Sequence, residues 1–395
     1  MKLNESSMIT NDLQRTRQTK RTIEEDEIAK AFPSSIARAM RCSSSSSLSS
    51  SGKITELETN KKTNEERCLR AKFDRTKTFC LICQARKIEL VNPRTGLSVK
   101  TYEGAHAREV RDCAPAKDNS KFVSVGGDKG VFVWDVRTGQ TLRRYRGHES
   151  FGVNAAKFLE PGEVSEDGRW QSSQSGYGSN VCVTVGYDRA VKFWDVRSNS
   201  SEAMESVSAF RDAATDVAVK GHKAEEIVVS SIDGTIKTFD VRKGEIRTDI
   251  LGHPITAIDL SSDERLLVAT LEQSVVLLDT SSGEVLQTYR GFANDEAVFL
   301  RATFTPDDKF VCLGDTQGSI HVWDLVHCGL NEEEEEVLGR SSNANNLPRF
   351  EIPKAHANTI SNIEFTKYSF DSNTKNSKKY SMLTCSLDGF VKFWT

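Results

Sequence analysis

Three segments of the chain repeat one set of side chains: a histidine, a serine or threonine, an aspartate and a tryptophan. In each, the hydroxyl residue precedes the aspartate by four positions, and the aspartate precedes the tryptophan by six. A hydroxyl beside an imidazole and a carboxylate is the arrangement of a hydrolase that forms an acyl-enzyme. Such a nucleophilic site is expected once in a chain, so three copies at one spacing favour a structural role. Buried polar groups must be paired, so in that role the four side chains would hydrogen-bond within the fold. The sets are His106, Ser124, Asp128 and Trp134; His148, Thr184, Asp188 and Trp194; and His356, Thr384, Asp388 and Trp394.

The same order of strands and turns surrounds these residues. Lys121–Val125 and Gly130–Trp134 alternate apolar residues with the period that predicts β-strands, and the intervening Gly126–Lys129 predicts a tight turn. A further turn at Thr138–Gln140 is followed by an outer strand at Thr141–Arg146. The sequence therefore predicts small antiparallel sheets and no helical bundle.

The pattern recurs at a period that identifies the fold. Trp134–Arg137 reappears as Trp194–Arg197 and, with phenylalanine in the first place, as Phe239–Arg242. Seven equivalent positions are separated by 43, 60, 45, 39, 45 and 71 residues. A period of about 40–45 residues is typical of β-propeller blades. The sequence predicts an all-β, seven-bladed propeller, with equivalent positions at Val91, Trp134, Trp194, Phe239, Leu278, Trp323 and Trp394.

The two long steps predict insertions. Residues 161–179 are rich in glycine and serine, and residues 328–348 contain the acidic run Glu332–Glu336. Neither segment alternates, and surface loops tolerate such additions at little cost in loop-closure entropy. We therefore expect both insertions to lie in loops.

The ends of the chain differ from the repeats. The last repeat stops at Thr395, one strand short of four, and an open ring would leave an unpaired edge. We expect the segment 53–59, with Ile54 and Leu57, to close the ring, so that the propeller spans residues 53–395. Residues 1–52 combine charge clusters with a serine run and have too few apolar residues to fold, which predicts a disordered tail.

Composition narrows the function. The 395 residues carry a formal net charge of −3, which gives no strong attraction to nucleic acid or membranes. The nine cysteines include Cys80 and Cys83, but no second pair with metal-ligand spacing accompanies them, so we expect reduced core thiols, no metal and no cofactor. Without a signal sequence or a long apolar stretch, an intracellular protein is expected. The basic cluster Arg15–Arg21 is either a nuclear localisation signal or a solvated charge run, so nucleus and cytoplasm are both expected.

Beyond generic WD repeats, the chain resembles the mitogen-activated protein kinase organizer family of seven-bladed WD40 proteins. The resemblance covers the propeller, not the tail, and is densest from Arg211 to Leu325. It rests on Ser231–Gly234, Phe239–Gly244, Pro254–Thr256, Tyr289–Gly291 and Trp323–Leu325, with Asn92–Gly96 and Arg144–His148 further forward.

The resemblance implies a non-enzymatic scaffold that assembles kinase-cascade components or spliceosomal proteins in pre-mRNA splicing. It implies a monomer within larger complexes that contacts nucleic acid only indirectly. The chain departs from the family in its tail and insertions, in Phe292 where a histidine is expected, and in Gln317 at a turn aspartate.

Two sets of basic residues are candidate partner sites. Five lie near turns or the starts of inner strands, where they would bind acidic or phosphorylated segments of protein partners: Arg86, Arg108, Lys129, Arg189 and Arg211. The alternative is a substrate receptor of a cullin-type ubiquitin ligase, because such receptors carry a Trp-Asp-x-Arg box. In that case the adaptor-binding residues are Arg137, Arg197 and Arg242.

Overall fold

The computed structural model describes residues 54–57, 67–74, 76, 78–160, 180–220, 225–295, 298–325, 347–366 and 380–394. One compact unit comprises residues 55–364 and 383–393; a second comprises 1–54, 365–382 and 394–395, of which few residues are described. The predicted tail 1–52, the insertion 161–179 and residues 328–346 of the second insertion lie outside the described residues.

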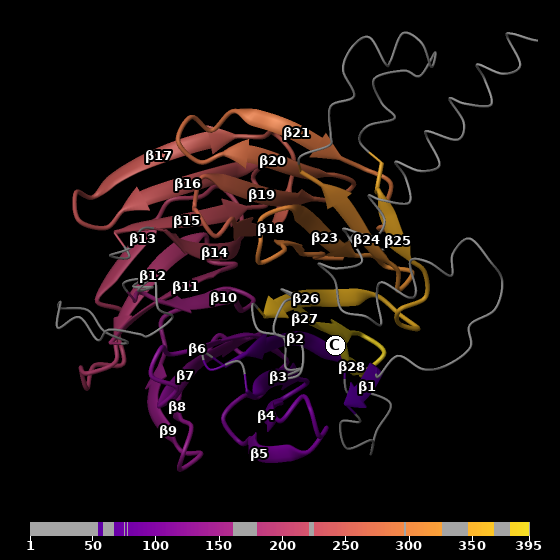
Figure 1. The fold of residues 1–395 in the computed structure, drawn as a ribbon. Coiled ribbons are helices and arrows are strands. Elements are labelled where there is room, and N and C mark those ends of the chain that lie inside the picture. Colours follow the sequence, from indigo (N-terminus) through magenta and orange to yellow (C-terminus); the bar gives the residue numbers. More distant parts are fainter. Residues whose placement is uncertain are drawn as a thin grey trace, which may run out of the picture. The chain divides into compact units, whose positions relative to one another are not determined.

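All described elements are β-strands, and they form seven four-stranded sheets (Figure 1). The first three sheets are β2 (Cys68–Phe73), β3 (Cys80–Gln84), β4 (Lys87–Val91), β5 (Ser98–Tyr102); β6 (Val110–Pro115), β7 (Lys121–Gly126), β8 (Val131–Asp135), β9 (Thr141–Tyr145); and β10 (Val153–Phe158), β11 (Val181–Gly186), β12 (Ala190–Asp195), β13 (Glu205–Ser208). The next three are β14 (Ala214–Lys220), β15 (Glu226–Ser231), β16 (Thr235–Asp240), β17 (Glu245–Ile250); β18 (Ile255–Leu260), β19 (Leu266–Leu271), β20 (Val275–Asp279), β21 (Val285–Tyr289); and β22 (Ala302–Phe304), β23 (Phe310–Gly314), β24 (Ile320–Asp324), β25 (Phe350–Ile352).

The seventh sheet differs in connectivity. Its order is β1-β28-β27-β26, with β26 (Ile360–Thr366), β27 (Ser381–Ser386), β28 (Val391–Trp394) and β1 (Ile54–Leu57). In the other six sheets, four consecutive strands pair as neighbours. The fold is therefore an all-β, seven-bladed β-propeller, as the repeat period predicts.

A β-bulge at the start of the first strand recurs in five sheets. The pairing register shifts between Cys68 and Arg70, and at the same place in β6, β10, β14 and β18. A bulge adds a residue to one strand and re-aims the side chains that follow it. In three of these strands the residue that resumes pairing is charged, namely Arg70, Asp112 and Asp216.

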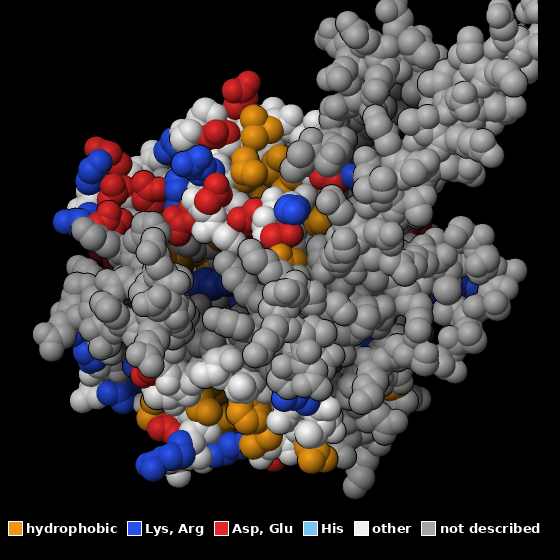
Figure 2. Space-filling view, viewed as in Figure 1, with side chains coloured by type: hydrophobic (Ala, Val, Ile, Leu, Met, Phe, Trp, Pro, Cys, Tyr) orange, Lys and Arg blue, Asp and Glu red, His pale blue; other side chains and the backbone are white. Residues whose placement is uncertain are grey.

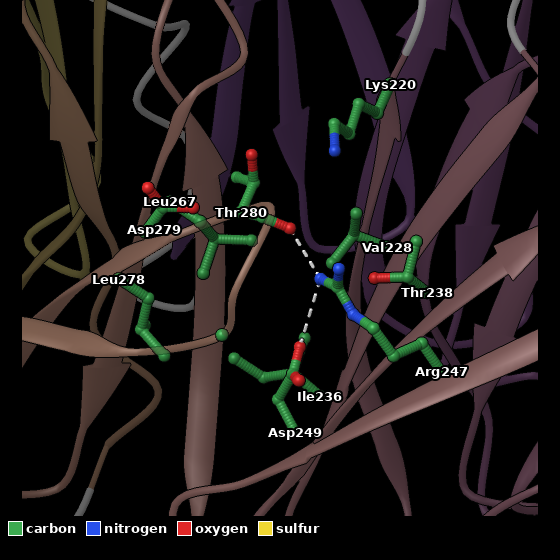
Figure 3. Close-up of a pocket in the computed structure, with 11 residues that line it drawn as sticks. Lys220, Val228, Ile236, Thr238, Arg247, Asp249, Leu267, Leu278, Asp279 and Thr280 are labelled. Atoms are coloured by element: carbon green, nitrogen blue, oxygen red, sulfur yellow. Dashed lines mark hydrogen bonds and ion pairs between the residues drawn. The ribbon is translucent and has the colours of Figure 1, made fainter.

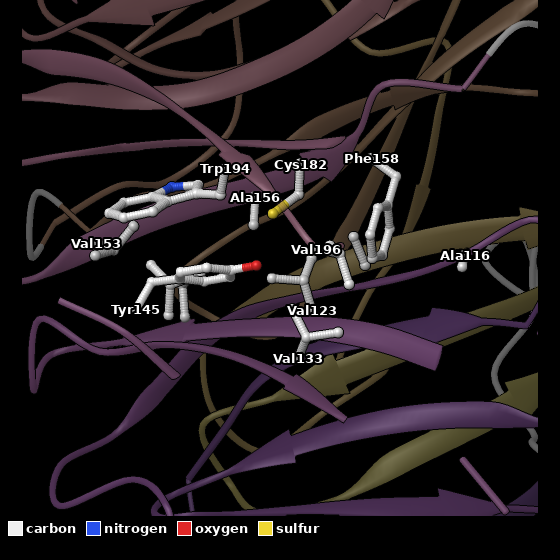
Figure 4. Packing of buried hydrophobic residues seen from close by; sticks show 13 residues of the cluster. Ala116, Val123, Val133, Tyr145, Val153, Ala156, Phe158, Cys182, Trp194 and Val196 are labelled. Carbon is white, nitrogen blue, oxygen red and sulfur yellow. The ribbon is translucent and has the colours of Figure 1, made fainter. Parts of the chain in front are cut away.

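Apolar side chains of adjacent sheets form the cores. Between the sheets β6–β9 and β10–β13, Val123, Val133 and Tyr145 pack with Phe158 and Trp194 (Figure 4). The rings of Tyr145 and Trp194 are 5.0 Å apart between centroids. Both faces of most strands are buried in this way, which explains why apolar residues in the strands often run consecutively.

Candidate functional site

The repeated His–Ser/Thr–Asp–Trp sets form hydrogen-bond chains. In the first set, His106 Nδ1 lies 3.0 Å from Asp128 Oδ1, its Nε2 lies 2.8 Å from Ser124 Oγ, and the Trp134 indole N–H donates to that oxygen at 2.8 Å. One proton arrangement satisfies every group: indole to hydroxyl, hydroxyl to Nε2, and Nδ1–H to the carboxylate.

The second set repeats all of these contacts, and the third repeats the two contacts of the histidine. His148 lies 2.9 Å from Asp188 and 2.8 Å from Thr184, which accepts from Trp194 at 2.8 Å. His356 lies 3.1 Å from Asp388 and 2.8 Å from Thr384. Trp394 is buried at the end of β28.

Burial decides between the catalytic and structural interpretations of these sets. The hydroxyl residues Ser124, Thr184 and Thr384 are all 0% exposed. A nucleophile must reach the carbonyl that it attacks, and a substrate cannot reach side chains that are fully buried in the sheets. Burial by itself would raise the pKa of Asp388, but hydrogen bonds from His356 and from backbone N–H groups lower that pKa to about 2. The sets therefore act as buried braces and not as acyl-transfer sites.

Sequence reasoning missed a related but incomplete group. In the sixth sheet His321, on β24, lies 2.9 Å from Asp315, and the Trp323 indole N–H donates to the backbone carbonyl of Arg290 at 3.3 Å. Here the histidine comes after the aspartate in sequence. In the other three sets it comes before the aspartate, so a search for that order does not find this group. The sequence signal for it is the histidine two residues before Trp323.

A second repeated feature links neighbouring sheets along their outer strands. Tyr145 Oη donates to the Asp195 carbonyl, and Tyr102 Oη to that of Val136, each at 3.0 Å. Burial raises the pKa of Tyr102 to about 12. The carbonyls lie at the end of the third strand of the next sheet or just after it, and because they are backbone groups no side-chain pattern predicts them.

Arg247 makes the corresponding link between β17 and the turn after β20 (Figure 3). Its guanidinium donates to the Thr280 carbonyl at 2.5 Å and lies 3.3 Å from Asp249. It also donates to the Ser281 carbonyl at 2.8 Å. The cavity beside it measures 10 Å³, which is room for about one water molecule. Arg247 thus holds two sheets together, and the cavity beside it is too small to hold a ligand.

The five predicted partner-binding residues are all exposed and lie in two kinds of loop. Arg86, Lys129 and Arg189 are in turns between the second and third strands of their sheets, whereas Arg108 and Arg211 precede first strands. Because neighbouring strands are antiparallel, both kinds of loop lie at the same end of a sheet. We call these five residues, contributed by four consecutive sheets, the basic loop surface.

Two members of the basic loop surface have left-handed backbone. Lys129 has φ 64° and Arg189 has φ 62°, whereas the equivalent turn position is glycine in other sheets, for example Gly234 with φ 81°. The left-handed conformation costs a residue with a side chain about 1–2 kcal/mol. Lys129 Nζ donates to the Glu149 carbonyl at 2.7 Å, while Arg211 is held through its backbone N–H by Asp233 at 2.9 Å.

Aromatic and polar residues beside this surface escaped sequence analysis. Phe151, just before β10, is 78% exposed, an unusual position for a phenylalanine. Arg111 stacks over the Tyr187 ring at 5.1 Å and donates to Asn154 at 3.0 Å. These residues belong to the same end of their sheets as the basic loop surface.

The three alternative adaptor-binding arginines lie at the opposite end, in the turns after third strands. All are exposed, but Arg197 pairs with Asp195 at 3.0 Å and Arg242 with Glu225 at 2.5 Å. The Arg137 carbonyl accepts a hydrogen bond from Lys100.

Basic and acidic side chains intermix near β17, and a hydrophobic cluster lies over β21 (Figure 2).

Comparison with known proteins agrees with this geometry. Residues 96–135 and 139–195 match the family model "WD domain, G-beta repeat", and residues 195–338 match the "VID27 C-terminal WD40-like domain". The chain belongs to the WD-repeat family. Among the described residues of this WD-repeat protein, no helix is long and apolar enough to cross a membrane.

Individual relatives are distant. The chain is 23% identical to the WD repeat domain-containing protein 83 homolog of Dictyostelium discoideum, over 65% of this chain and 81% of that protein. It is 34% identical to WD repeat domain-containing protein 83 of Rattus norvegicus over 34% of this chain, and 25% identical to autophagy-related protein 16 of Arabidopsis thaliana over 61%. These matches span only 42% and 44% of the rat and Arabidopsis proteins.

Proposed function

We propose that this WD-repeat protein is a non-enzymatic scaffold whose basic loop surface binds acidic or phosphorylated segments of other proteins. The observation that carries the proposal is the placement of five exposed cations at one end of four consecutive sheets. Propeller loops on a rigid ring are suited to binding, since the sheets fix where each side chain is presented.

Backbone strain supports the choice of this surface. Glycine would relieve the left-handed turns at Lys129 and Arg189, yet two adjacent sheets carry a cation there. Strain kept at an exposed position is typical of functional residues. Lysine and arginine make charge-assisted hydrogen bonds to carboxylates and phosphates, which fits an acidic partner.

The complexes that we propose follow the family resemblance. A scaffold of this kind acts in pre-mRNA splicing, in mitogen-activated kinase signalling or in both, and works in the nucleus and the cytoplasm. It assembles as a monomer into larger complexes, with nucleic acid reached only through its protein partners. The rat relative is called WD repeat domain-containing protein 83 and the Dictyostelium relative its homolog, names that support the WD-repeat part of this proposal.

Affinity purification of the tagged protein from its own cells, followed by mass spectrometry, tests the proposal. Recovery of spliceosomal proteins supports the splicing role, and recovery of kinases of a mitogen-activated cascade supports signalling. Recovery of a cullin with its propeller adaptor, lost when Arg137 and Arg197 are changed to alanine, would instead favour the ligase receptor.

A further inference from the structure

The first strands of the sheets surround a cavity of 180 Å³, which we call the central cavity. Residues of β2, β10, β14, β18, β22 and β26 line it, all within the larger compact unit. In Figure 2, blue Lys or Arg side chains lie deep in the hollow beside β10 and β14. Charged side chains are expensive to bury, so a cavity lined with them needs an explanation.

The buried carboxylates of this region have partners. Asp216 accepts the Ile258 N–H at 3.3 Å and pairs with Arg301 at 2.5 Å. Asp259 accepts from Thr303 at 2.8 Å and from the Phe304 N–H at 3.0 Å. A cationic ligand would therefore have to compete with these existing contacts.

Asp112 pairs with more cations than the other buried carboxylates of this region. One of its oxygens, Oδ2, accepts the Ala156 N–H at 3.1 Å. The other, Oδ1, lies 2.7 Å from Lys72 Nζ and 3.1 Å from Arg70 Nε. A single carboxylate oxygen thus faces two buried cations, with Glu364 supplying further negative charge near Arg70.

Two cations that line the cavity, Arg70 and Lys157, have fewer hydrogen-bond and ion-pair partners than these carboxylates. Arg70 is 6% exposed, and its Nη1 has no hydrogen-bond partner among the described residues. Across that same part of the chain, no hydrogen bond or ion pair reaches the Lys157 ammonium. Repulsion from Lys72, then burial, lowers the pKa of Lys157 to about 8, with Arg70 acting in the same direction and Asp112 and Asp216 opposing it. The largest single influence on this ammonium is therefore the positive charge of Lys72.

We propose that the central cavity binds an oxyanion carrying a phosphoryl group, with Lys157 and the guanidinium of Arg70, two residues that line it, as its ligands. An arginine fork and an ammonium are the side chains that bind phosphate most effectively. On the same measure by which 10 Å³ holds about one water molecule, a 180 Å³ cavity has room for the group and several waters. This site is independent of the basic loop surface and would stand if the scaffold proposal failed.

The test measures thermal unfolding and ³¹P NMR of the full chain with inorganic phosphate, against chloride at equal ionic strength. Phosphate is expected to raise the Tm of the wild type above its value in chloride. Lys157→Met is expected to unfold at a higher Tm in chloride, because the repulsion is gone, and to bind phosphate at least tenfold more weakly. A purely structural lysine would lower the Tm and leave the phosphate effect unchanged.

Two further variants keep the test specific. Lys157→Arg is expected to retain phosphate binding, and Lys309→Met, which removes an exposed lysine, is expected to respond as the wild type does. A phosphoserine peptide shows whether the bound phosphoryl group belongs to a protein segment or to the free ion. Tighter binding of the peptide, in competition with phosphate, identifies a phosphorylated protein segment, whereas binding of phosphate alone identifies the free ion. No phosphate-specific response, or an equal response in Lys157→Met, would overturn the proposal.

Discussion

The Thr184→Val substitution tests the structural role of the repeated hydrogen-bond chains. Valine keeps the shape of threonine but removes the hydroxyl that serves His148 and the Trp194 indole at 2.8 Å each. Both nitrogens then remain buried without a partner, since residue 184 is 0% exposed. An unsatisfied buried polar group costs about 1–3 kcal/mol, so the expected loss for two is about 2–6 kcal/mol.

That loss converts into a measurable shift in Tm. A propeller of about 340 residues has an unfolding entropy of about 0.7 kcal/mol/K, so about 3 kcal/mol lowers the Tm by about 4 °C. Differential scanning calorimetry measures it, with Thr101→Val on the exposed face of β5 as the control, for which less than about 0.5 kcal/mol is expected. An unchanged Tm for Thr184→Val would refute the brace, and with it the account of why the sets recur.

Three other substitutions test the remaining contacts. Tyr145→Phe removes the hydrogen bond to the Asp195 carbonyl and is expected to cost about 1 kcal/mol in urea unfolding; no loss would mean that this link between sheets is idle. Asp388 has a pKa of about 2 in the folded chain against 3.8 in a model peptide, so its contribution is present above pH 4 and is lost as pH falls toward 2. Asp388→Asn should therefore flatten the acid limb of the stability profile, and an unchanged limb would contradict the assignment. Asp112→Asn removes the carboxylate that pairs with two buried cations and is expected to cost about 3–5 kcal/mol by urea titration; a neutral effect would show that water already screens them.

The repeat itself was accessible from sequence because its markers are local. The spacing of Ser124, Asp128 and Trp134 is set by two strands and the turn between them, so it survives as a fixed interval. Period-two alternation and turn residues located most strands for the same reason. The fold class follows from counting these units.

The central cavity and the links between sheets were not accessible in this way. The charges of Arg70 and Asp112 meet because their strands come from neighbouring sheets and both begin with a bulge, a feature without a sequence signature. Tyr145 and Arg247 bind backbone carbonyls, which carry no residue identity. Both faces of the strand that contains Cys80 and Cys83 are buried. Alternation of apolar and polar residues therefore could not indicate which side chains these cysteines contact.

The central claim is that the basic loop surface holds the protein's partners. The most direct test is quantitative affinity purification of three proteins from the same cells: the wild type, the triple variant Lys129→Glu, Arg189→Glu and Arg211→Glu, and the control Arg137→Glu with Arg197→Glu. At about 1 kcal/mol for each exposed pair, the triple variant is expected to lose partners more than tenfold, and the control to retain them. Retention by the triple variant together with loss in the control would contradict the claim and move the partner site to the opposite end of the sheets.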